Sequence, residues 1–411
     1  MMGRQSLVFD PFSPEFQQDR YAVFSQMRAR CPIYKESNTN FGGRNFTTWH
    51  FTCYEDVLFA FRDKRFVKEL KKVLPAEQIP PVPEEIRELD RSLQNMVVFR
   101  DPPDHTRLRS LVNQAFTPSI AEQLEPRIRE IAEHLLIPFE PGTAFDLLHD
   151  FAYQLPVTVI AEMLGAPVED RELVKDWSRS LIPTIDHNPP MEALVHANRA
   201  VIEFRDYCRD LVHARYRNPQ DDLISGLIRA VHEDERMSED EMLDMCVLML
   251  EAGHETTTNL IANSVYLMCR YSDQQALLRA EPKWMESAIE EVLRFESVAQ
   301  LRHRIVGEDM EYKNNFLQRG DLVTAWIASA NRDPNIFSDP DTFDITRSKN
   351  PHLAFGQGIH YCLGAPLSRK EGAIALQTLF DKYPRLELAD KEVEWIPTPG
   401  RRGLKALFVQ V

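Results

Sequence analysis

The sequence predicts a mainly α-helical protein with small β-sheets. Apolar residues recur at helical spacing over long stretches, and strand-like runs are few and short. The chain has 411 residues, of which 43% are hydrophobic and 27% charged, as in a folded globular protein with a large core. Length alone suggests two or three domains. Because no repeat, composition shift or Gly/Ser-rich linker divides the chain, we expect one domain over residues 1–411.

The expected helices follow from apolar periodicity and from proline at first turns. Pro102 and Pro103 precede one helix, and Pro118 opens another that continues to Leu135, since proline suits the first turn. Other helices are expected over 148–164, 191–216, 238–269 and 283–296, and from Cys362 to about residue 382. Strands are expected around 47–52, 304–312, 321–324 and 404–411. At 1.5 Å per residue, the 238–269 helix is long enough to cross a domain.

Net charge and apolar runs exclude several classes of protein. The formal charge of −15 argues against a nucleic-acid partner, which would require clustered cations. The N-terminus lacks a signal-peptide pattern, and no apolar run approaches the ~20 residues of a membrane span. Six cysteines form no C-x-x-C pair, so neither a zinc site nor a thioredoxin motif is indicated. We expect a cytoplasmic monomer without a membrane or nucleic-acid partner.

A glycine-rich stretch, FGQGIHYCLG, surrounds Cys362 where a helix is expected to begin. Glycine lets a backbone approach a flat ligand and adopt positive φ. N–H groups at a helix N-terminus stabilise a thiolate. The residue types leave two interpretations open: a thiolate presented to a large ligand, or a glycine turn with a buried cysteine. A dinucleotide loop would need a third glycine where Tyr361 stands.

This stretch resembles the heme-binding loop of the cytochrome P-450 family, F-G-x-G-x-H-x-C-x-G. Every fixed position is matched, by Phe355, Gly356, Gly358, His360, Cys362 and Gly364. The resemblance implies that Cys362 is the axial thiolate on the iron of heme b and that His360 lies near a propionate. It also implies the family's fold, with heme between a long distal helix and the loop and helix that carry the cysteine. A thiolate ligand favours O–O cleavage.

A second stretch, AGHETT, lies inside the long expected helix. Ala252 and Thr256 share a helix face, and the small residues open space beside a possible proton-relay pair, Glu255 and Thr256. The alternative is an exposed glutamate and a threonine bonded back to a carbonyl. Thr258 excludes an H-E-x-x-H zinc site. The stretch is similar to the family's acid–alcohol motif, which implies that Glu255 and Thr256 guide protons to dioxygen while Ala252 and Gly253 make room for it.

A third motif, E-x-x-R, is formed by Glu291 and Arg294. By itself it indicates no more than a surface helix pair. In the family such a pair braces the core behind the heme together with an arginine from a later segment. Here Thr342 occupies that later position, and Arg347 is our candidate for the third partner.

Other cationic residues match the family's propionate ligands. His105 and Arg109 are four apart, so they share one helix face and suit an anion, unless the face is simply solvated. The resemblance implies that both hold heme propionates and that Arg304 is a further propionate ligand.

The expected substrate pocket contains one polar residue of special interest. Glu251 stands where relatives usually have an apolar residue, and a buried carboxylate costs several kcal/mol unless it is paired. We expect it to pair with a basic residue or to bind a polar group of the substrate. The other expected pocket residues are Val97, Val98, Leu181, Val298, Ala299, Gln300 and Leu301.

The resemblance implies a monooxygenase that inserts one atom of O2 into a C–H bond of an apolar small molecule. The branch is that of soluble bacterial members, including macrolide and polyketide hydroxylases; fatty acids, steroids and terpenoids are other candidate substrates. NAD(P)H would supply electrons only indirectly, through a ferredoxin or flavodoxin and its reductase. A local basic patch for such an acidic partner is expected from Arg107, Arg109, Arg369 and Lys370.

Two other functions are compatible with Cys362. A peroxide-driven heme peroxygenase is disfavoured, because such relatives usually lack the Glu255–Thr256 pair. A non-catalytic heme sensor or binding module would keep the cysteine but would not need a proton relay.

Overall fold

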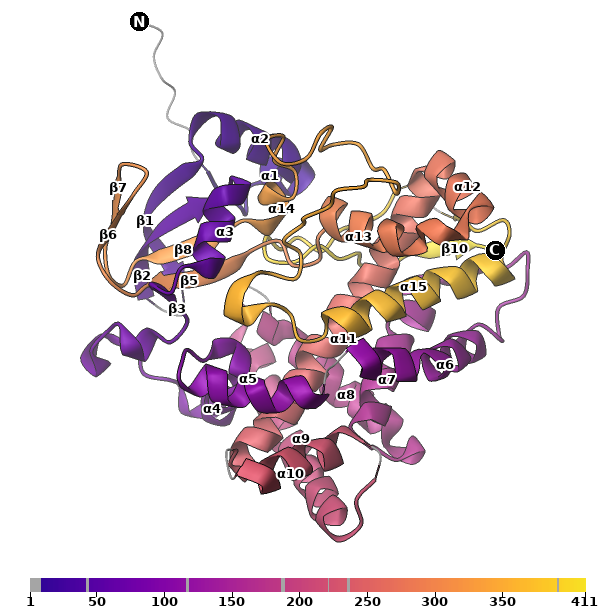
Figure 1. Cartoon of the computed structure of the whole chain (residues 1–411), viewed down its shortest axis with the longest axis horizontal. Coiled ribbons are helices and arrows are strands. Elements are labelled where there is room, and N and C mark those ends of the chain that lie inside the picture. The colour runs from indigo at the N-terminus through magenta and orange to yellow at the C-terminus, as the bar shows by residue number, and fades with distance from the viewer. Residues whose placement is uncertain are drawn as a thin grey trace, which may run out of the picture. The chain divides into compact units, whose positions relative to one another are not determined.

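The computed structural model describes residues 9–41, 44–115, 118–185, 189–220, 222–234, 237–389 and 392–411 (Figure 1). Two compact units are built from segments far apart in the sequence. Unit 1 comprises Met1–Pro80, Leu293–Tyr361 and Trp395–Arg402; unit 2 comprises Pro81–Val292, Cys362–Glu394 and Gly403–Val411. The fold is mainly α with small sheets, which confirms the predicted class. One domain over residues 1–411 stays a prediction.

Unit 1 contains a five-stranded sheet in the order β1-β2-β8-β5-β3. Its strands are β1 (Ile33–Phe41), β2 (Arg44–Phe51), β3 (Phe66–Val67), β5 (Arg302–Val306) and β8 (Leu322–Ala325). Strands β2 and β8 run parallel, and the other neighbours are antiparallel. Helices α1 (Pro14–Gln18), α2 (Arg20–Arg30), α3 (Tyr54–Arg62) and α14 (Ile327–Ala330) and the hairpin β6 (Met310–Tyr312)–β7 (Asn315–Leu317) complete the unit.

Unit 2 is a helical assembly around α11 (Glu239–Arg270). A capping box between Ser238 and Glu241 starts this helix, which packs on α7, α9 and α15. Figure 1 shows α15 alongside α6, and the two helices are in contact. The other helices are α4 (Arg87–Asn95), α5 (Asp104–Ala115), α6 (Pro118–Leu135), α7 (Gln154–Met163), α8 (Arg171–Leu181), α9 (Met191–Arg217), α10 (Leu223–Asp234), α12 (Ser272–Ala280) and α15 (Ala365–Lys382). Helix α13 (Met285–Phe295) starts in unit 2 and ends in unit 1. A small sheet joins β4 (Ala144–Asp146), β10 (Phe408–Gln410) and β9 (Glu387–Leu388).

Two expected elements are interrupted. The strand expected over 304–312 is broken at Gly307, where a Cβ atom would come within 2.8 Å of the Arg65 carbonyl oxygen. The helix expected over 148–164 starts with a π-helical turn, Leu148–Ala152, before α7. Strand β1 was not predicted, because its sequence IYKESNTNF lacks an apolar alternation.

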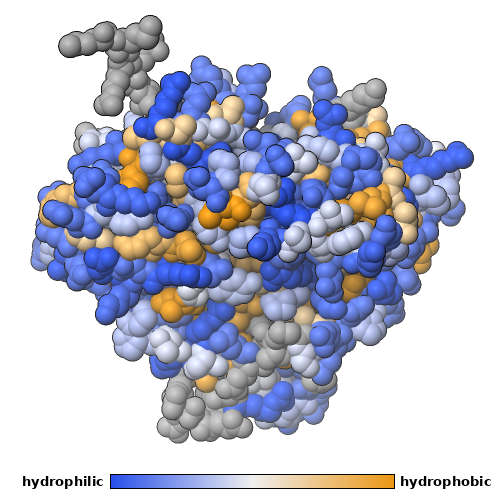
Figure 2. Space-filling view, turned by 45° about the horizontal axis from the view of Figure 1, so that its top comes forward, coloured by the Kyte–Doolittle hydropathy of each residue, from blue (hydrophilic) through white to orange (hydrophobic). Residues whose placement is uncertain are grey.

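Hydrophilic residues dominate the visible surface. On the face drawn in Figure 2 the hydrophobic residues form small scattered patches within a largely hydrophilic surface. Among the helices of the described segments, none is long and apolar enough to cross a membrane.

Candidate functional site

The loop before Cys362 is shaped by two glycines. Gly356 and Gly358 have φ of 71° and 74°, which side chains rarely adopt. A Cβ atom on Gly358 would lie 2.5 Å from the Phe61 carbonyl oxygen, so only glycine lets this part of the loop pack on α3. The loop includes a 3₁₀ turn, Gly358–His360. Sequence reasoning therefore identified positions where the backbone requires glycine.

Arg304 lies beside this part of the loop. It is buried on β5, and its guanidinium carbon lies 5.2 Å from the ring centroid of Phe61. Phe61 thus contacts Arg304 through its ring, and its carbonyl abuts Gly358. Within unit 1, a cation is placed next to the loop that leads to the cysteine.

Cys362 is half-buried and precedes α15 by three residues. Its position at the N-terminal end of an 18-residue helix favours the thiolate, because the unpaired N–H groups of the first turn carry partial positive charge. A Cβ atom on Gly364, between Cys362 and the helix, would meet no described atom within 4 Å. The structure therefore has room for a side chain or ligand atom beside Gly364.

Helix α5 brings Arg109 within electrostatic range of Cys362. Burial lowers the pKa of Arg109, and the Cys362 thiolate acts in the opposite direction. Burial, and then Arg109, lower the pKa of His105, which leaves a neutral imidazole at pH 7. A neutral imidazole donates one N–H and a guanidinium donates several, so this face suits a carboxylate.

The centre of α11 carries the predicted acid–alcohol pair. Glu255 is 7% exposed, and Asn259 Nδ2 donates to its Oε1 at 3.0 Å and to its backbone oxygen at 2.7 Å. Thr256 Oγ1 donates to the Ala252 carbonyl at 2.8 Å. The hydroxyl hydrogen is thus engaged, and the threonine oxygen offers acceptor capacity toward the exposed side of Ala252.

Gly253 allows a close helix contact. A Cβ atom at this position would lie 2.8 Å from Cδ1 of Ile160, so the glycine admits an α7 side chain against α11. Its role in making room for dioxygen stays a prediction.

Arg294 is a structural centre of unit 1. Its side chain is fully buried, and its guanidinium donates to the carbonyls of Asn331, Pro340 and Thr342 at 3.0, 2.8 and 3.1 Å. Arg347 also donates to the Thr342 carbonyl, at 3.2 Å. The two arginines thus converge on one residue. Glu291, one turn before Arg294 on α13, is fully buried.

The expected pocket residues fall in both units. In unit 2, Val97 and Leu181 are buried, Val98 is half-buried, and Glu251 is 7% exposed. In unit 1, Val298 is buried and Ala299 half-buried. Gln300 accepts from Arg20 at 3.1 Å, and Leu301 belongs to an aromatic-rich core cluster, so these two residues stabilise unit 1.

A buried ionic network next to Val97 was missed by sequence reasoning. Asp244 on α11 is fully buried, pairs with Arg205 of α9, and accepts from Asn95 Nδ2 at 2.8 Å. Arg100 Nη2 in turn donates to Asn95 Oδ1 at 2.8 Å. The only sequence signal was an aspartate within an otherwise apolar helix face. The network holds both ends of the 95–100 segment.

Three of the four cations of the expected basic patch, Arg107, Arg369 and Lys370, are paired with carboxylates. Arg369 Nη2 lies 2.9 Å from Glu290 Oε2, and Lys370 Nζ lies 3.0 Å from Glu125 Oε2. Arg107 Nη1 donates to Glu241 Oε2 at 3.0 Å. These pairs leave little uncompensated positive charge, which the sequence did not reveal because each partner comes from another helix.

These residues fit a thiolate-ligated heme. Within unit 2, Cys362 is a soft ligand of the kind that heme iron binds in heme-thiolate proteins. His105 and Arg109, in the same unit, carry N–H donors of the kind that propionates would need. These residue types are those that a heme-thiolate class of site would use.

The comparisons with known proteins agree with this class. The family model described as "Cytochrome P450" matches residues 67–400, and the chain belongs to that family. The polyketide biosynthesis cytochrome P450 PksS of Bacillus subtilis is 37% identical over 99% of both chains. The vitamin D(3) 25-hydroxylase of Pseudonocardia autotrophica is 39% identical, with 92% of this chain and 90% of that protein covered. Family membership implies heme iron, dioxygen and monooxygenase activity.

A solved structure shows the same fold. P450BioI, in complex with an acyl carrier protein ligated to hexadec-9Z-enoic acid, matches with a TM-score of 0.88 and 38% identity. The match covers 96% of this chain and 98% of that one. The predicted P-450 fold is confirmed.

Proposed function

We propose that this monooxygenase hydroxylates an apolar small molecule at heme b held by Cys362. The observation that carries the proposal is the presence, in one unit, of Cys362 beside Arg109 and of Glu255 and Thr256 at the centre of α11. Macrolides, polyketides, fatty acids, steroids and terpenoids fit an apolar pocket containing one carboxylate. Relatives named for polyketide biosynthesis and vitamin D3 hydroxylation support this range.

The bound heme would supply the oxidation chemistry, and the protein residues would orient the substrate and control protons. Thr256 Oγ1 donates to the Ala252 carbonyl, so its oxygen would be available to accept a hydrogen bond from a ligand. Glu255, which directly precedes Thr256, is oriented by Asn259 and serves as the proton source. Val97 and Leu181 would exclude water from the substrate.

Removing the proton-handling groups should uncouple electron consumption from product. We expect Glu255→Gln and Thr256→Ala to lower product formed per NAD(P)H by about 10²-fold, the lower range for one general acid. The measurement is product and peroxide yield with a ferredoxin and reductase. Thr257→Ala is the matched control, because its hydroxyl bonds to Gly253 O and Ser368 at 3.2 Å, toward α15.

The same assay separates the peroxygenase alternative. A peroxygenase would form product with peroxide alone as fast as with dioxygen and the redox chain. If Thr256→Ala left that rate unchanged, the result would contradict the proposed role of Thr256 in proton transfer. A chain that binds heme and yields no product under either condition would support the sensor alternative.

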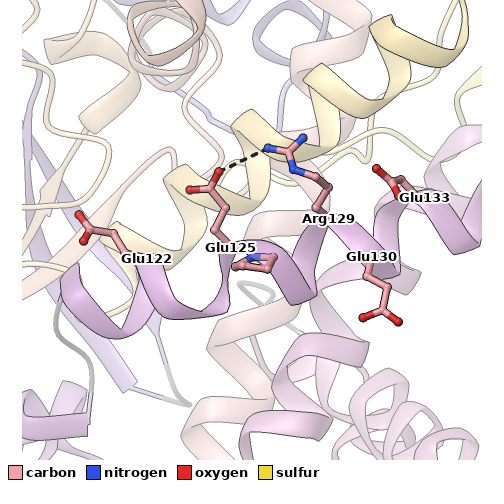
Figure 3. A pocket seen from close by; sticks show the side chains of 6 residues that line it. Glu122, Glu125, Arg129, Glu130 and Glu133 are labelled. Atoms are coloured by element: carbon pink, nitrogen blue, oxygen red, sulfur yellow. Dashed lines mark hydrogen bonds and ion pairs between the residues drawn. The ribbon is translucent and has the colours of Figure 1, made fainter.

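We propose that the electron-transfer partner docks over α6, α13 and α15. A groove of about 670 Å³ lies between these helices, and its rim carries Lys283, Glu286, Glu290, Arg369 and Lys370. Figure 3 shows further glutamates along α6, with Glu125 bonded to Arg129. Acidic and basic side chains alternate on this surface. The carboxylates of an acidic ferredoxin or flavodoxin would therefore have to replace the protein's own carboxylates as ion-pair partners, which limits the electrostatic attraction.

Exposing one cation should reveal the partner's charge. We expect Glu290→Gln to raise the rate of reduction by an acidic ferredoxin about 2- to 5-fold at low salt, because it removes the negative charge that is paired with Arg369. Arg369→Gln should lower that rate by a similar factor, and both effects should shrink at high ionic strength. Stopped-flow reduction measures the rate. Unchanged rates in both variants would place the docking surface elsewhere.

We propose that Glu251 binds a polar group of the substrate. Thr184 Oγ1 lies 2.6 Å from Glu251 Oε1, and among the described residues burial and this hydrogen bond are what act on the carboxyl group, without a basic side chain. Burial raises the pKa of Glu251 to about 7, while the Thr184 hydrogen bond acts in the opposite direction. The neutral acid that predominates below pH 7 can donate a hydrogen bond to a substrate oxygen.

Glu251 variants test this role. For a substrate with an acceptor group, we expect Glu251→Leu to raise the Kd about 10-fold, as for one hydrogen bond. Wild-type affinity should fall as pH rises through about 7, since the donor proton is lost, and Glu251→Gln should remove this pH dependence. Spin-state titration measures the Kd. Equal affinity and regiochemistry in Glu251→Leu and wild type would exclude the substrate role.

A further inference from the structure

His254 is the member of the α11 motif that the proton-handling role leaves unexplained. Its Nδ1 lies 2.5 Å from the Leu250 carbonyl oxygen, and its Nε2 lies 2.8 Å from Ser178 Oγ. Because a carbonyl only accepts, Nδ1 carries the hydrogen, and Nε2 forms the hydrogen bond with the Ser178 hydroxyl. The residue is 1% exposed, and its ring meets that of Tyr153 edge-on at a centroid distance of 5.8 Å. The ring is therefore fixed on three sides.

Glu251 makes an equivalent contact one turn earlier on α11. Residues 251 and 254 are three apart, so their side chains leave the helix on the same side. Glu251 forms a hydrogen bond with Thr184, whose Oγ1 also lies 2.7 Å from the Leu181 carbonyl oxygen. Thr184 belongs to the 3₁₀ turn Ile182–Ile185 that continues α8. Ser178 lies in α8 itself. One continuous segment, residues 171–185, is therefore hydrogen-bonded to the centre of α11 at two points.

The two contacts flank functionally important positions in the chain. Leu181, an expected pocket residue, lies between Ser178 and Thr184 in the sequence. Glu255 directly follows His254 on α11. A change in either contact therefore acts at the same time on a pocket-lining segment and on the helix turn that handles protons.

We propose that His254 and Glu251 are positioning residues that hold the α8–Ile185 segment on α11 through the hydroxyls of Ser178 and Thr184. Without these two hydrogen bonds the segment opens more often. The resulting effect on catalysis rests on the proposed function, because a displaced Leu181 presents the substrate poorly to Glu255 and Thr256. The effect on segment opening does not depend on the substrate or on turnover.

Hydrogen–deuterium exchange of the purified heme-loaded enzyme tests the tether directly. We expect Ser178→Ala and Thr184→Val each to raise amide exchange within residues 171–185 about 5-fold, as for the loss of one hydrogen bond, and the double variant to raise it further. Ser178→Thr keeps the hydroxyl and should keep exchange near the wild-type rate. Ser180→Ala is the matched control, because its hydroxyl bonds to Asp176 O within α8 at 3.0 Å.

Exchange in α6 serves as the internal reference for global destabilisation. Wild-type exchange over 171–185 in the double variant would overturn the tether, as would an equal rise in α6. The catalytic consequence is a several-fold rise in substrate Kd and a lower product yield per NAD(P)H in Thr184→Val. Raised exchange with unchanged Kd and yield would overturn the link to catalysis, whereas failure of the proposed function would appear as wild-type yield in Glu255→Gln.

Discussion

Replacing Cys362 by alanine should abolish the red-shifted Soret band of the reduced carbon-monoxide complex and reduce monooxygenase activity below detection. Alanine offers no ligand to iron. A thiolate ligand favours O–O cleavage, so under the proposed assignment heme bound to the variant would lack the electron donation that the reaction needs. The measurements are the ferrous–CO spectrum and product yield of the heme-loaded protein.

Cys269→Ala is the matched control for this variant. Cys269 is also half-buried in unit 2, but burial raises its pKa to about 12, so it stays a thiol. Its removal should leave the spectrum unchanged. Far-UV circular dichroism shows whether Cys362→Ala remains folded, and Cys362→Ser offers a closer volume match. A thiolate-type band that survives in Cys362→Ala and disappears in another cysteine variant would contradict the assignment.

The elements predicted from the sequence are those with a strong local signal. The periodicity of residues 118–135 and 238–269 gave helix bounds close to those of α6 and α11, because apolar spacing and terminal residues agree. The polar strand β1 had no such signal. Its structure depends on pairing with β2, a contact that the pattern of β1 itself does not encode.

The functional motifs could be identified from the sequence because each of them is short and continuous. Cys362 and its glycines are adjacent in the chain, and the backbone conformation of Gly356 and Gly358 explains why glycine stands there. Ion-pair partners that lie on different helices could not be identified from the sequence. The Arg369–Glu290 pair depends on how α15 packs against α13. From the sequence, Arg369 was predicted to be part of a basic patch, whereas in the structure it forms an ion pair.

Glu251 illustrates what could and could not be predicted from the sequence. The sequence identified it as a carboxylate in apolar surroundings, and the structure shows it buried as expected. Its partner, the Thr184 hydroxyl, lies on a 3₁₀ turn that no local pattern placed next to α11. The cost of burying the Glu251 carboxylate could be predicted from the sequence. Its hydrogen-bond partner, the Thr184 hydroxyl, could not, because their contact depends on tertiary packing.

Replacing Arg294 by methionine should destabilise the protein by about 3 kcal/mol. The carbonyls of Asn331 and Pro340 lose their charged donor, and an unpaired buried polar group costs about 1–3 kcal/mol, whereas the Thr342 carbonyl keeps Arg347. Such a loss is a large fraction of the 5–15 kcal/mol typical of folded proteins, so low yield and poor heme retention are also expected. Urea unfolding followed by circular dichroism measures the change.

Two further variants keep this test informative if Arg294→Met does not fold. Arg294→Lys retains the charge but lacks the planar fork that reaches several carbonyls, and we expect it to be folded and about 2 kcal/mol less stable than wild type. Arg347→Met is the matched control, because Arg347 is half-buried and shares the Thr342 carbonyl. Its loss should cost less than about 1 kcal/mol, since water can replace it.

The double variant Arg294→Lys/Arg347→Met decides whether the two arginines act together. Because both arginines bond to one carbonyl, removing Arg347 from the Arg294→Lys variant leaves Thr342 O with the lysine ammonium as the only possible donor from these two positions. The combined loss should then exceed the sum of the single losses by about 0.5–1 kcal/mol, as for residues that share a partner. Strict additivity would mean that Arg347 is not the third member of the Glu291–Arg294 brace, even though it reaches the same backbone oxygen.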